Sequence, residues 1–318
     1  MDSTSPPAGV AVVGSINADL TAFGSPLPRP GETVAADSFA MTLGGKGANQ
    51  ALAAVRAGVP TYMVGAVGDD LFRTLTLHAL SGEGVDTAAV AVVDGHTGIA
   101  HIRVDVVTGQ NDIAIVAEAN AHVTPEIAVS RLRTLAGQVG VVLLQLEIPV
   151  DTVVAVAAVA RELGIRVILD PAPAQVLPDE VWAGVDVVTP NETEAEVLTG
   201  ISIIDDASAE RAGRWFLQRG AAAAVITLAE RGAVVVTSEG VTAHRAFSVQ
   251  AVDTTAAGDA FAGSLGASLA RSLPWDEAVR RALAAGACAV QVRGASPSLP
   301  TAAQVDAFLA QHADVNVV

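Results

Sequence analysis

The sequence predicts an α/β fold with a doubly wound, mostly parallel central sheet flanked by helices and a small additional β-sheet. Short, mostly apolar segments such as residues 10–16 and 141–146 alternate with helical segments, as expected for strands buried on both faces. Residues 97–107 and 112–117 instead alternate apolar and polar positions around a Thr108-Gly109-Gln110-Asn111 turn, which predicts a hairpin with one exposed face. Hydrophobic residues make up 51% of the 318-residue chain, enough for a large buried core.

The first part of the chain supplies strands and helices in alternation. Residues 10–16 form the first expected strand, and residues 21–31, with three prolines, form a loop or edge segment. A strand over 33–43 leads to a helix over 48–57 that Gly58 closes, and a strand over 61–67 precedes a helix ending near Leu80.

The αβ alternation resumes after the hairpin. We expect helices from Pro125, over 150–163, briefly after Asn191, over 209–219, and from about Ala257, Asp276 and Thr301. The expected strands lie over 141–146, 165–169, 185–188, 223–228, 234–237 and 242–249. Neither an internal repeat nor a linker divides the chain, so a single domain is expected.

Charge and composition exclude several classes of function. The 34 acidic and 18 basic residues give a net charge of −16, which disfavours binding to nucleic acids or anionic membranes. The chain has no apolar run of about 18 residues, and residues 1–8 lack a signal-peptide pattern, so a soluble cytoplasmic protein is expected. Cys288 is the sole cysteine, and the six histidines lack metal-ligand spacing.

Polar residues follow the expected strands. In a doubly wound fold, ligands bind outside the carboxyl ends of the strands, so these residues predict a site. They are Asn17, Asp19, Asp69, Asp70, Glu147, Asp170, Asn191 and Thr227.

The segment D-T-T-A-A-G-D, residues 253–259, predicts an anion site. Apolar residues recur at helical spacing after it, so a helix begins near Ala257, and its first N–H groups and positive dipole end face outward. Asp259 lies within this site. Its carboxylate either helps to cap the helix or accepts a proton from a nucleophile that attacks a phosphoryl group, and the segment alone leaves both interpretations open.

Other motifs also allow two interpretations. Gly44–Gln50 is not a P-loop, because Gly47 rather than Ser or Thr follows Lys46; either Lys46 and Asn49 donate to a polar ligand or the segment is a plain strand-to-helix turn. Lys46 is also the only lysine in the chain. Asn17 and Asp19 share one face of an extended segment, where they either grip vicinal hydroxyls or form an Asx turn.

Glu147 and the pair Asn191 and Glu194 are equally open. Glu147 either belongs to a site or marks the point where its strand reaches solvent. Asn191 and Glu194 form an N-x-x-E pattern that fits a helix capping box or the positioning of a hydrated Mg²⁺ near phosphates. Neither a nucleophile elbow nor a Ser-His-Asp grouping is evident, so phosphoryl transfer is the chemistry that fits best.

Several motifs together resemble those of a known family. They are G-S-I-N-A-D at 14–19, P-G-E-T at 30–33, G-G-K-G-A-N-Q-A at 44–51, Q-L-E at 145–147, P-A-P-A at 171–174, T-P-N-E-T-E-A-E at 189–196, A-V-D-T-T-A-A-G-D at 251–259 and G-A-S-P-S at 294–298. Over residues 10–309 the chain resembles the PfkB family of carbohydrate kinases, and within it the ribokinases.

The resemblance implies ATP-dependent phosphorylation of D-ribose at O5, giving ribose 5-phosphate. Asp259 would be the general base, and Ala256, Ala257 and Gly258 would offer N–H groups as an anion hole. The residues that would hold ribose are Asn17, Asp19, Gly44, Gly45, Lys46, Asn49 and Glu147. The alternatives are a related kinase for another pentose, deoxyribose or a nucleoside, and a non-catalytic sugar-binding sensor.

The resemblance also implies cofactors and a nucleotide site. Asn191 and Glu194 would act near the Mg²⁺-ATP phosphates, and the nucleotide site would be lined by Thr227, Leu228, Ala229, Glu230, Arg231, Gly232, Gly258 and Leu283. An activating K⁺ would be bound by Asp253, Thr255, Ala289, Val292, Gly294 and Ser298. Two departures affect the nucleotide: Ala229 and Glu230 interrupt the family's T-L-G-x-x-G pattern, and Leu283 stands where a polar residue often lies near the adenine.

Finally, the resemblance implies domain bounds. A single kinase domain would span 9–312 after a disordered tail over 1–8. Segments of about 17–46 and 96–117 would form a lid over the sugar, and this lid would pair with that of a second subunit in a homodimer.

Overall fold

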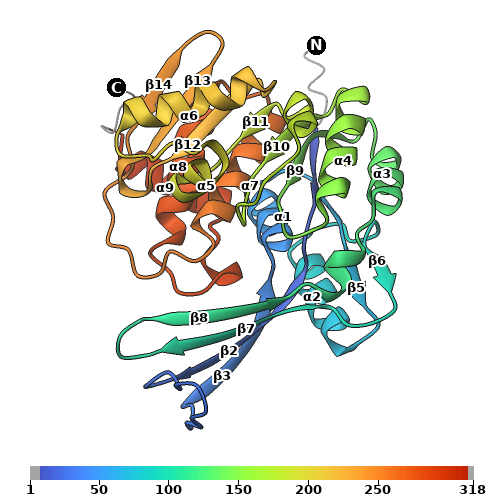
Figure 1. Ribbon diagram of the computed structural model, residues 1–318, viewed down its shortest axis with the longest axis vertical. Helices are drawn as coiled ribbons and strands as arrows, with labels where there is room; N and C mark the ends of the chain where they lie inside the picture. The colour runs from blue at the N-terminus through green and yellow to red at the C-terminus, as the bar shows by residue number, and fades with distance from the viewer. Residues whose placement is uncertain (1–7, 314–318) are drawn as a thin grey trace.

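The computed structural model describes residues 8–313, so nearly all of the expected tail over 1–8 lies outside the described residues. Its main sheet has eight strands in the order β14-β13-β12-β11-β10-β9-β1-β4 (Figure 1). Six strands run parallel: β1 (Gly9–Val13), β4 (Thr61–Val64), β9 (Val139–Leu144), β10 (Arg166–Leu169), β11 (Val187–Val188) and β12 (Ala223–Thr227). Two antiparallel strands, β13 (Ala233–Thr237) and β14 (Val241–His244), complete one edge.

A separate four-stranded sheet projects from this body (Figure 1). Its strand order is β3 (Ser38–Gly44), β2 (Asn17–Gly24), β7 (Gly98–Asp105) and β8 (Asn111–Val116). β2 pairs in parallel with β7, whereas its pairing with β3 and that of β7 with β8 are antiparallel. The two segments predicted to form a small sheet therefore do so. A two-stranded sheet of β5 (Ala66–Gly68) and β6 (Ala91–Val93) lies apart from it.

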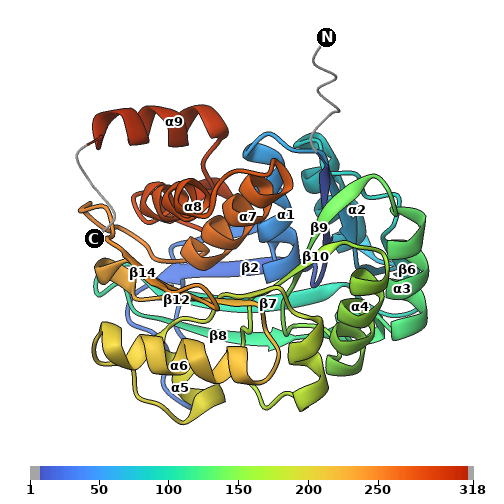
Figure 2. The same cartoon turned by 90° about the horizontal axis from the view of Figure 1, so that it is seen from above.

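Helices cover both faces of the main sheet (Figure 2). One layer contains α1 (Lys46–Arg56), α2 (Leu71–Gly82), α7 (Ala257–Ala270), α8 (Trp275–Ala289) and α9 (Ala302–Gln311). The other contains α3 (Pro125–Thr134), α4 (Val150–Glu162), α5 (Glu192–Thr199) and α6 (Asp206–Gln218). Short 3-10 helices are η1 (Glu118–His122), η2 (Asp179–Gly184), η3 (Ala229–Arg231) and η4 (Ser296–Ser298).

Each face of the main sheet has its own hydrophobic core. In β1, Val10 and Val12 pack with the first helical layer, whereas Ala11 and Val13 pack with the second. Successive side chains of a strand point to opposite faces, so a strand covered on both sides has to be apolar throughout. This explains the unbroken apolar runs in the sequence and confirms the predicted fold class. Among the described helices, none is both long and apolar enough to cross a membrane.

Several predicted boundaries were wrong. Residues 21–24 belong to β2 rather than to a loop, because β3 and β7 supply ladder partners on both sides as far as Phe23. The strand predicted from residue 33 begins only at Ser38. The single strand predicted over 61–67 is two strands, β4 and β5, that join different sheets. β6 was not predicted, and β14 ends at His244, before the predicted 249.

The strand order determines where a ligand can bind. Along the chain, β1 is followed by its neighbour β4 on one side, and β9 then returns to pair with β1 on the other side. The connections that leave β1 and β9 therefore diverge to opposite faces of the sheet. In open α/β sheets such a switch point leaves a crevice at the carboxyl ends of the strands, where ligands bind.

Candidate active site

Five chain segments meet at this crevice. They are the turn after β1, the start of α1, the residues after β9, Asp170 after β10, and the start of α7. Asp259 of α7 is bonded to α1, and Glu147 after β9 is bonded to the turn after β1. The site is therefore assembled from parts that are far apart in the sequence.

The first turn of α1 is held by Glu147. Gly45 precedes the helix with a φ of 88°, a left-handed conformation that glycine adopts without strain. Glu147 Oε2 accepts the backbone N–H of Lys46 at 3.0 Å and the hydroxyl of Ser15 at 2.6 Å. The Ser15 oxygen in turn accepts the N–H of Gly47 at 3.2 Å. Because a carboxylate is favoured at the positive end of a helix, Glu147 stabilises this turn besides facing the crevice.

One face of α1 carries three polar side chains toward α7 and β10. Lys46, Asn49 and Gln50 are three and four positions apart, so they share this face. The Nζ atom of Lys46 lies 3.8 Å from Asp170 Oδ2. Asn49 Nδ2 donates to Asp259 Oδ2 at 3.1 Å. Gln50 Nε2 donates to Asp259 Oδ1 at 3.2 Å and to Asp170 Oδ2 at 2.8 Å.

The carboxylates around this face hold their protons more strongly than usual. Burial raises the pKa of Asp259 to about 6, although Lys46 acts in the opposite direction. Burial likewise raises the pKa of Asp170 to about 6 and, with help from Glu147 and Asp259, that of Asp19 to about 7. A buried acid with a pKa near neutrality is suited to exchange protons with a ligand.

Lys46 is the cation at the centre of this acidic group. Burial acts to lower its pKa, but the carboxylates of Asp170, Asp259, Glu147 and Glu194 outweigh burial and raise the pKa above its ordinary value. The ammonium group therefore stays charged throughout the neutral range. It offers a compact positive charge to a polar or anionic ligand.

The small sheet adds two side chains to the site. Asn17 begins β2 and is buried, and its Oδ1 accepts Asn120 Nδ2 at 2.7 Å. Asn120 is itself fixed by the backbone N–H of Ile16, which donates to its Oδ1 at 2.8 Å. The carboxylate of Asp19 lies so close to Gly44 of β3 that a Cβ atom at position 44 would overlap it. Asn17 and Asp19 thus occupy one side of β2, as the two-residue spacing predicted.

The start of α7 has the features of an anion site. Ala256 precedes it with a φ of 59°, and no side chain caps the helix. Within the part of the chain that the structure describes, the N–H groups of Gly258 and Asp259 have no hydrogen-bond acceptor, whereas that of Ala257 reaches Thr254 O at 3.3 Å. The Asp259 carboxylate bonds to α1 instead of capping its own helix, so the capping interpretation of Asp259 is wrong.

Asn191 and Glu194 form a capping box at the start of α5. Each side chain accepts the backbone N–H of the other residue at 2.8 Å. Burial raises the pKa of Glu194, and the hydrogen bond from Asn191 opposes this. Asn191 and Glu194 therefore form the helix capping box that the N-x-x-E pattern allowed. Their role near Mg²⁺ stays a prediction.

The expected nucleotide loop follows β12. Leu228 N donates to Gly232 O at 2.7 Å, and Arg231 binds Glu192 with an N···O distance of 2.7 Å. Ala229 has a φ of 48°, a conformation that glycine adopts more easily. Leu283 lies half-buried in α8.

The expected K⁺ ligands fall on two segments that lie together. Asp253 accepts the N–H of Thr255 at 2.9 Å, the Thr255 hydroxyl at 2.6 Å and the N–H of Gly294 at 2.9 Å. The backbone N–H groups of Val252 and Asp253 both donate to Val290 O. The rest of the set follows α8: Ala289 at its end, then Val292, Gly294 and Ser298. A cluster of carboxylate, hydroxyl and carbonyl oxygens has the donor chemistry that a hard cation requires.

The described residues offer fewer ligands for a divalent metal ion than for K⁺. Over residues 8–313, no group of three or more His, Cys, Asp or Glu side chains is placed to hold a metal ion. A Mg²⁺ ion at this site would therefore take most of its ligands from phosphate and water, as this ion commonly does.

Sequence reasoning misplaced some residues and missed others. Asp69 and Asp70 do not belong to the crevice: Asp70 caps α2 and binds Thr97, and Asp69 pairs with Arg73 at 2.7 Å. Asp170 was predicted at this edge of the sheet but was given no role, and the residues of the network that were missed are Ser15, Gln50, Asn120 and Gln145. The spacing of Gln50, four residues after Lys46, was the one signal in the sequence that would have found it.

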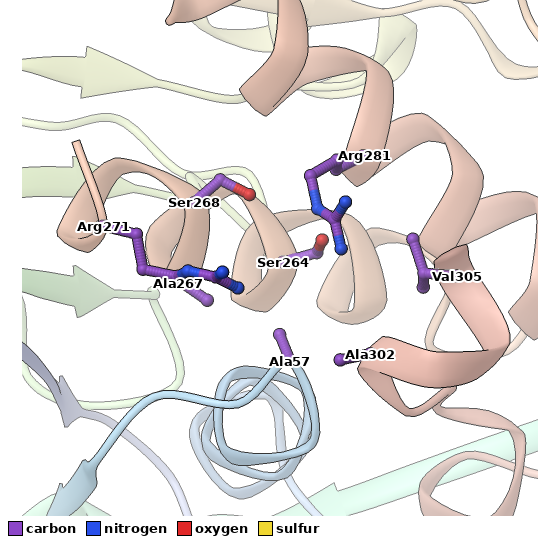
Figure 3. Close-up of a pocket in the computed structure, with 8 residues that line it drawn as sticks. All are labelled: Ala57, Ser264, Ala267, Ser268, Arg271, Arg281, Ala302 and Val305. Carbon is purple, nitrogen blue, oxygen red and sulfur yellow. The ribbon is translucent and has the colours of Figure 1, made fainter. Parts of the chain in front are cut away.

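An enclosed cavity elsewhere is too small for a substrate. It lies between the far ends of α1 and α7 and the helices α8 and α9, lined by Ser264, Ser268, Arg271 and Arg281 among others (Figure 3). Its volume of about 10 Å³ holds roughly one water molecule. The polar residues predicted for the site gather at the opposite ends of α1 and α7, so the crevice there is the candidate active site.

Comparisons with known proteins agree with this fold. Residues 8–302 match the pfkB family of carbohydrate kinases. Ribokinase of Haemophilus influenzae is 38% identical over 305 residues, 96% of this chain and 99% of that protein. Deoxyribokinase of Salmonella typhi is 34% identical over 302 residues, 94% and 98% of the two chains.

A solved structure supports the same relationship. The structure of Arabidopsis thaliana ribokinase complexed with ribose and ATP has a TM-score of 0.86 and 32% identity, covering 95% of this chain and 98% of that one. The ribokinase-like fold predicted from the sequence is confirmed. The chain belongs to the pfkB family of carbohydrate kinases.

Proposed function

We propose that this protein phosphorylates D-ribose at O5 with ATP, giving D-ribose 5-phosphate and ADP. The observation that carries the proposal is a buried carboxylate, Asp259, beside the unpaired N–H groups at the start of α7. A proton acceptor next to an anion site is the arrangement that phosphoryl transfer to an alcohol requires. The choice of ribose as the sugar and ATP as the phosphoryl donor rests on the similarity to ribokinases.

The proposed reaction balances as an in-line displacement. Asp259 accepts the proton of the 5-hydroxyl as its oxygen attacks the γ-phosphorus of ATP, and the bond from that phosphorus to the bridging oxygen breaks. The proton ends on Asp259 and passes to solvent after release of product. The N–H groups of Ala256, Ala257 and Gly258 stabilise the negative charge on the transferring group.

The sugar is oriented by the polar residues around the crevice. Asn17 and Asp19 from the small sheet, Lys46 and Asn49 from α1, and Glu147 bind its hydroxyl groups, while Gly44 and Gly45 allow close approach of the backbone. The nucleotide lies along Thr227 to Gly232 with Leu283 near its base. Asn191 and Glu194 position Mg²⁺ with the ATP phosphates, and the Asp253 cluster holds an activating K⁺.

The small sheet acts as a lid and as a dimer surface in this proposal. Its outer side, away from Asp19, exposes Phe39 and Met41 of β3, and Phe39 is 64% exposed. These alternate residues point to the same side of the sheet and form an apolar surface, which a second copy of the sheet would cover. We expect a homodimer that acts in the cytoplasm.

A second candidate substrate is 2-deoxyribose, because a deoxyribokinase is nearly as similar as the ribokinases. Asp19 and Asn17 favour ribose: a buried group that bonds a substrate hydroxyl loses its partner when that hydroxyl is missing. The decisive comparison is kcat/KM for ribose, 2-deoxyribose and a nucleoside. A higher value for either of the latter would overturn the assignment of ribose.

The direct test is ADP release by purified protein supplied with ribose and Mg²⁺-ATP, with the product identified by NMR. Asp259→Asn is expected to lose about 10²–10⁴-fold in kcat, the usual contribution of a positioned base. The matched control is Asp94→Asn, which removes an exposed carboxylate. Near-normal turnover by Asp259→Asn, or no ADP release with any sugar, would refute the proposed function.

A further inference from the structure

A fully buried amide, Gln50, joins Asp259 to a second carboxylate. Its Nε2 donates one hydrogen to Asp259 Oδ1 at 3.2 Å and the other to Asp170 Oδ2 at 2.8 Å. Both amide hydrogens are therefore used on carboxylates that come from different elements. A hydrogen bond to a charged acceptor is stronger than one between neutral groups.

A second buried amide fixes the orientation of the first. Gln145 Nε2 donates to Gln50 Oε1 at 2.6 Å. If the Gln50 amide were turned over, its oxygen would face two carboxylates and its NH₂ group would face another NH₂ group. Gln145 itself is positioned by packing, because its Oε1 fills the space that a Cβ atom at Gly14 would occupy and has no hydrogen-bond partner among the described residues. The chain from Gly14 through Gln145 to Gln50 thus leaves the amide one favourable orientation.

Gln50 is distinguished from Asn49 by what each has left to offer a ligand. Asn49 Nδ2 donates to Asp259 Oδ2, while Asn49 Oδ1 is buried and has no hydrogen-bond partner among residues 8–313. Asn49 therefore has a free acceptor for a sugar hydroxyl and can exchange its bond to Asp259 for one to substrate. Both hydrogens of the Gln50 NH₂ group are already donated to carboxylates and the side chain is fully buried, so its bond to Asp259 Oδ1 persists when substrate binds.

We propose that Gln50 is the positioning residue of the base: held by Gln145 and Asp170, it fixes Asp259 Oδ1 so that Oδ2 faces the 5-hydroxyl. This inference rests on the proposed function, since it requires Asp259 to be the base. Gln50 does not touch the substrate. It acts through the carboxylate, in the way that an outer partner orients a catalytic side chain.

The charged groups around Asp259 provide a way to distinguish a positioning role of Gln50 from a purely structural one. Lys46 from α1 favours the ionised form of Asp259, and so does the N–H of Gln50. Asp170 after β10 opposes ionisation of Asp259, and Asp259 in turn raises the pKa of Asp19 from β2 and of Glu194 from α5; the Glu147 carboxylate after β9 also lies nearby. Removing Gln50 and removing the charge of Asp170 should therefore shift the titration of the base in opposite directions.

The test compares Gln50→Leu, Gln145→Leu and Asp170→Asn by the pH profile of kcat for ribose. Activity is lost as the pH falls and the base is protonated. Gln50→Leu is expected to lower kcat about 10–100-fold with the KM for ribose changed by less than about threefold, and to move the acid limb to higher pH. Asp170→Asn moves the acid limb to lower pH, because a negative neighbour has been removed.

Gln145→Leu should have a smaller effect of the same kind as Gln50→Leu. It leaves both bonds from Gln50 to the carboxylates but releases the amide's orientation, so its loss of kcat should be smaller and its limb should move in the same direction as that of Gln50→Leu. Circular dichroism and thermal unfolding establish that each variant is folded. If Gln50→Leu fails to fold, the opposite shifts of Gln145→Leu and Asp170→Asn carry the test.

Asp259→Asn separates the two levels of the proposal. If Asp259→Asn retains turnover, the proposed function is wrong. If Asp259→Asn is inactive but Gln50→Leu keeps the wild-type kcat and pH profile, the positioning role alone is overturned. The glutamine variants, Gln50→Leu and Gln145→Leu, are compared with Asp170→Asn by the acid limbs of their pH profiles. Limbs that move in the same direction would also overturn the positioning role, whereas limbs that move in opposite directions support it.

Discussion

The substitution that removes the proposed base should also stabilise the ligand-free protein. Asp259 is 5% exposed, and burial raises its pKa to about 6. A raised pKa means that the folded protein favours the neutral acid, so keeping this group ionised costs folding free energy. The pKa of Asp259 in the folded protein is about 2 units above that of an ordinary aspartate. This difference corresponds to roughly 3 kcal/mol of destabilisation of the folded state at pH 8.

Asparagine at position 259 avoids this cost and fits the existing hydrogen bonds. Its oxygen can accept from Gln50, while its NH₂ group faces Asn49. Asn49 Oδ1 has no partner in the wild-type structure, so a turn of the Asn49 amide provides the acceptor that the new NH₂ group needs. The substitution therefore exchanges a buried charge for a neutral group with partners.

The measurement is thermal unfolding of wild type and Asp259→Asn between pH 5 and 8 without ligands. At pH 8 the variant is expected to unfold about 5 °C higher, given roughly 2 °C per kcal/mol for a large domain. Protonation of Asp259 in the folded state stabilises the wild type as the pH falls through about 6, so the difference should shrink toward pH 5. An unchanged or lower melting temperature at pH 8, or a gap that does not depend on pH, would refute the reasoning. Asp94→Asn, an exposed site, should leave the curve unchanged.

Three further predictions test other parts of the molecule. Phe39→Asp with Met41→Asp should convert a dimer into a monomer in analytical ultracentrifugation, because two charges enter the apolar surface of the small sheet; a persistent dimer would exclude this surface. Ala229→Gly should raise stability to urea by about 1 kcal/mol, because glycine tolerates a φ of 48°, and a loss of stability would contradict that reason. K⁺ should raise kcat relative to a large organic cation, and Asp253→Ala should abolish the difference; equal rates in both salts would argue against the cation site.

The sequence predicted the architecture well because strand burial follows directly from residue type. A parallel strand covered on both faces must be apolar, so residues 10–13 and 141–144 could be recognised without knowing their neighbours. The boundaries of β2 and β4 failed for the opposite reason. Residues 21–24 are strand only because β3 and β7 flank them, and the break between β4 and β5 depends on which sheet each strand joins. Pairing of that kind is not encoded in local composition.

The site was predicted in part for a comparable reason. In a doubly wound fold the carboxyl ends of the parallel strands lie along one edge, so Glu147 and Asp170 could be placed near one crevice from the sequence. The side-chain contacts within the crevice could not be predicted from the sequence. Gln50 looked like one polar residue in an Ala-rich helix, and its importance arises only because Asp170 and Asp259, 120 and 209 positions away, lie within hydrogen-bond distance of its amide.

The acidic character of the crevice explains why its cation and amides are arranged as they are. Asp170 and Asp259 are buried within reach of one ammonium group, that of Lys46, and a single cation cannot neutralise two carboxylates. The remaining stabilisation comes from neutral donors, the side-chain amides of Asn49 and Gln50, which favour the ionised form without adding charge. This leaves Asp259 with a pKa close to neutrality rather than far below it, so the carboxylate can accept a proton and release it again. A second cation in place of Gln50 would lower the pKa of Asp259 and make it a weaker base, which is a physical reason for an amide at position 50.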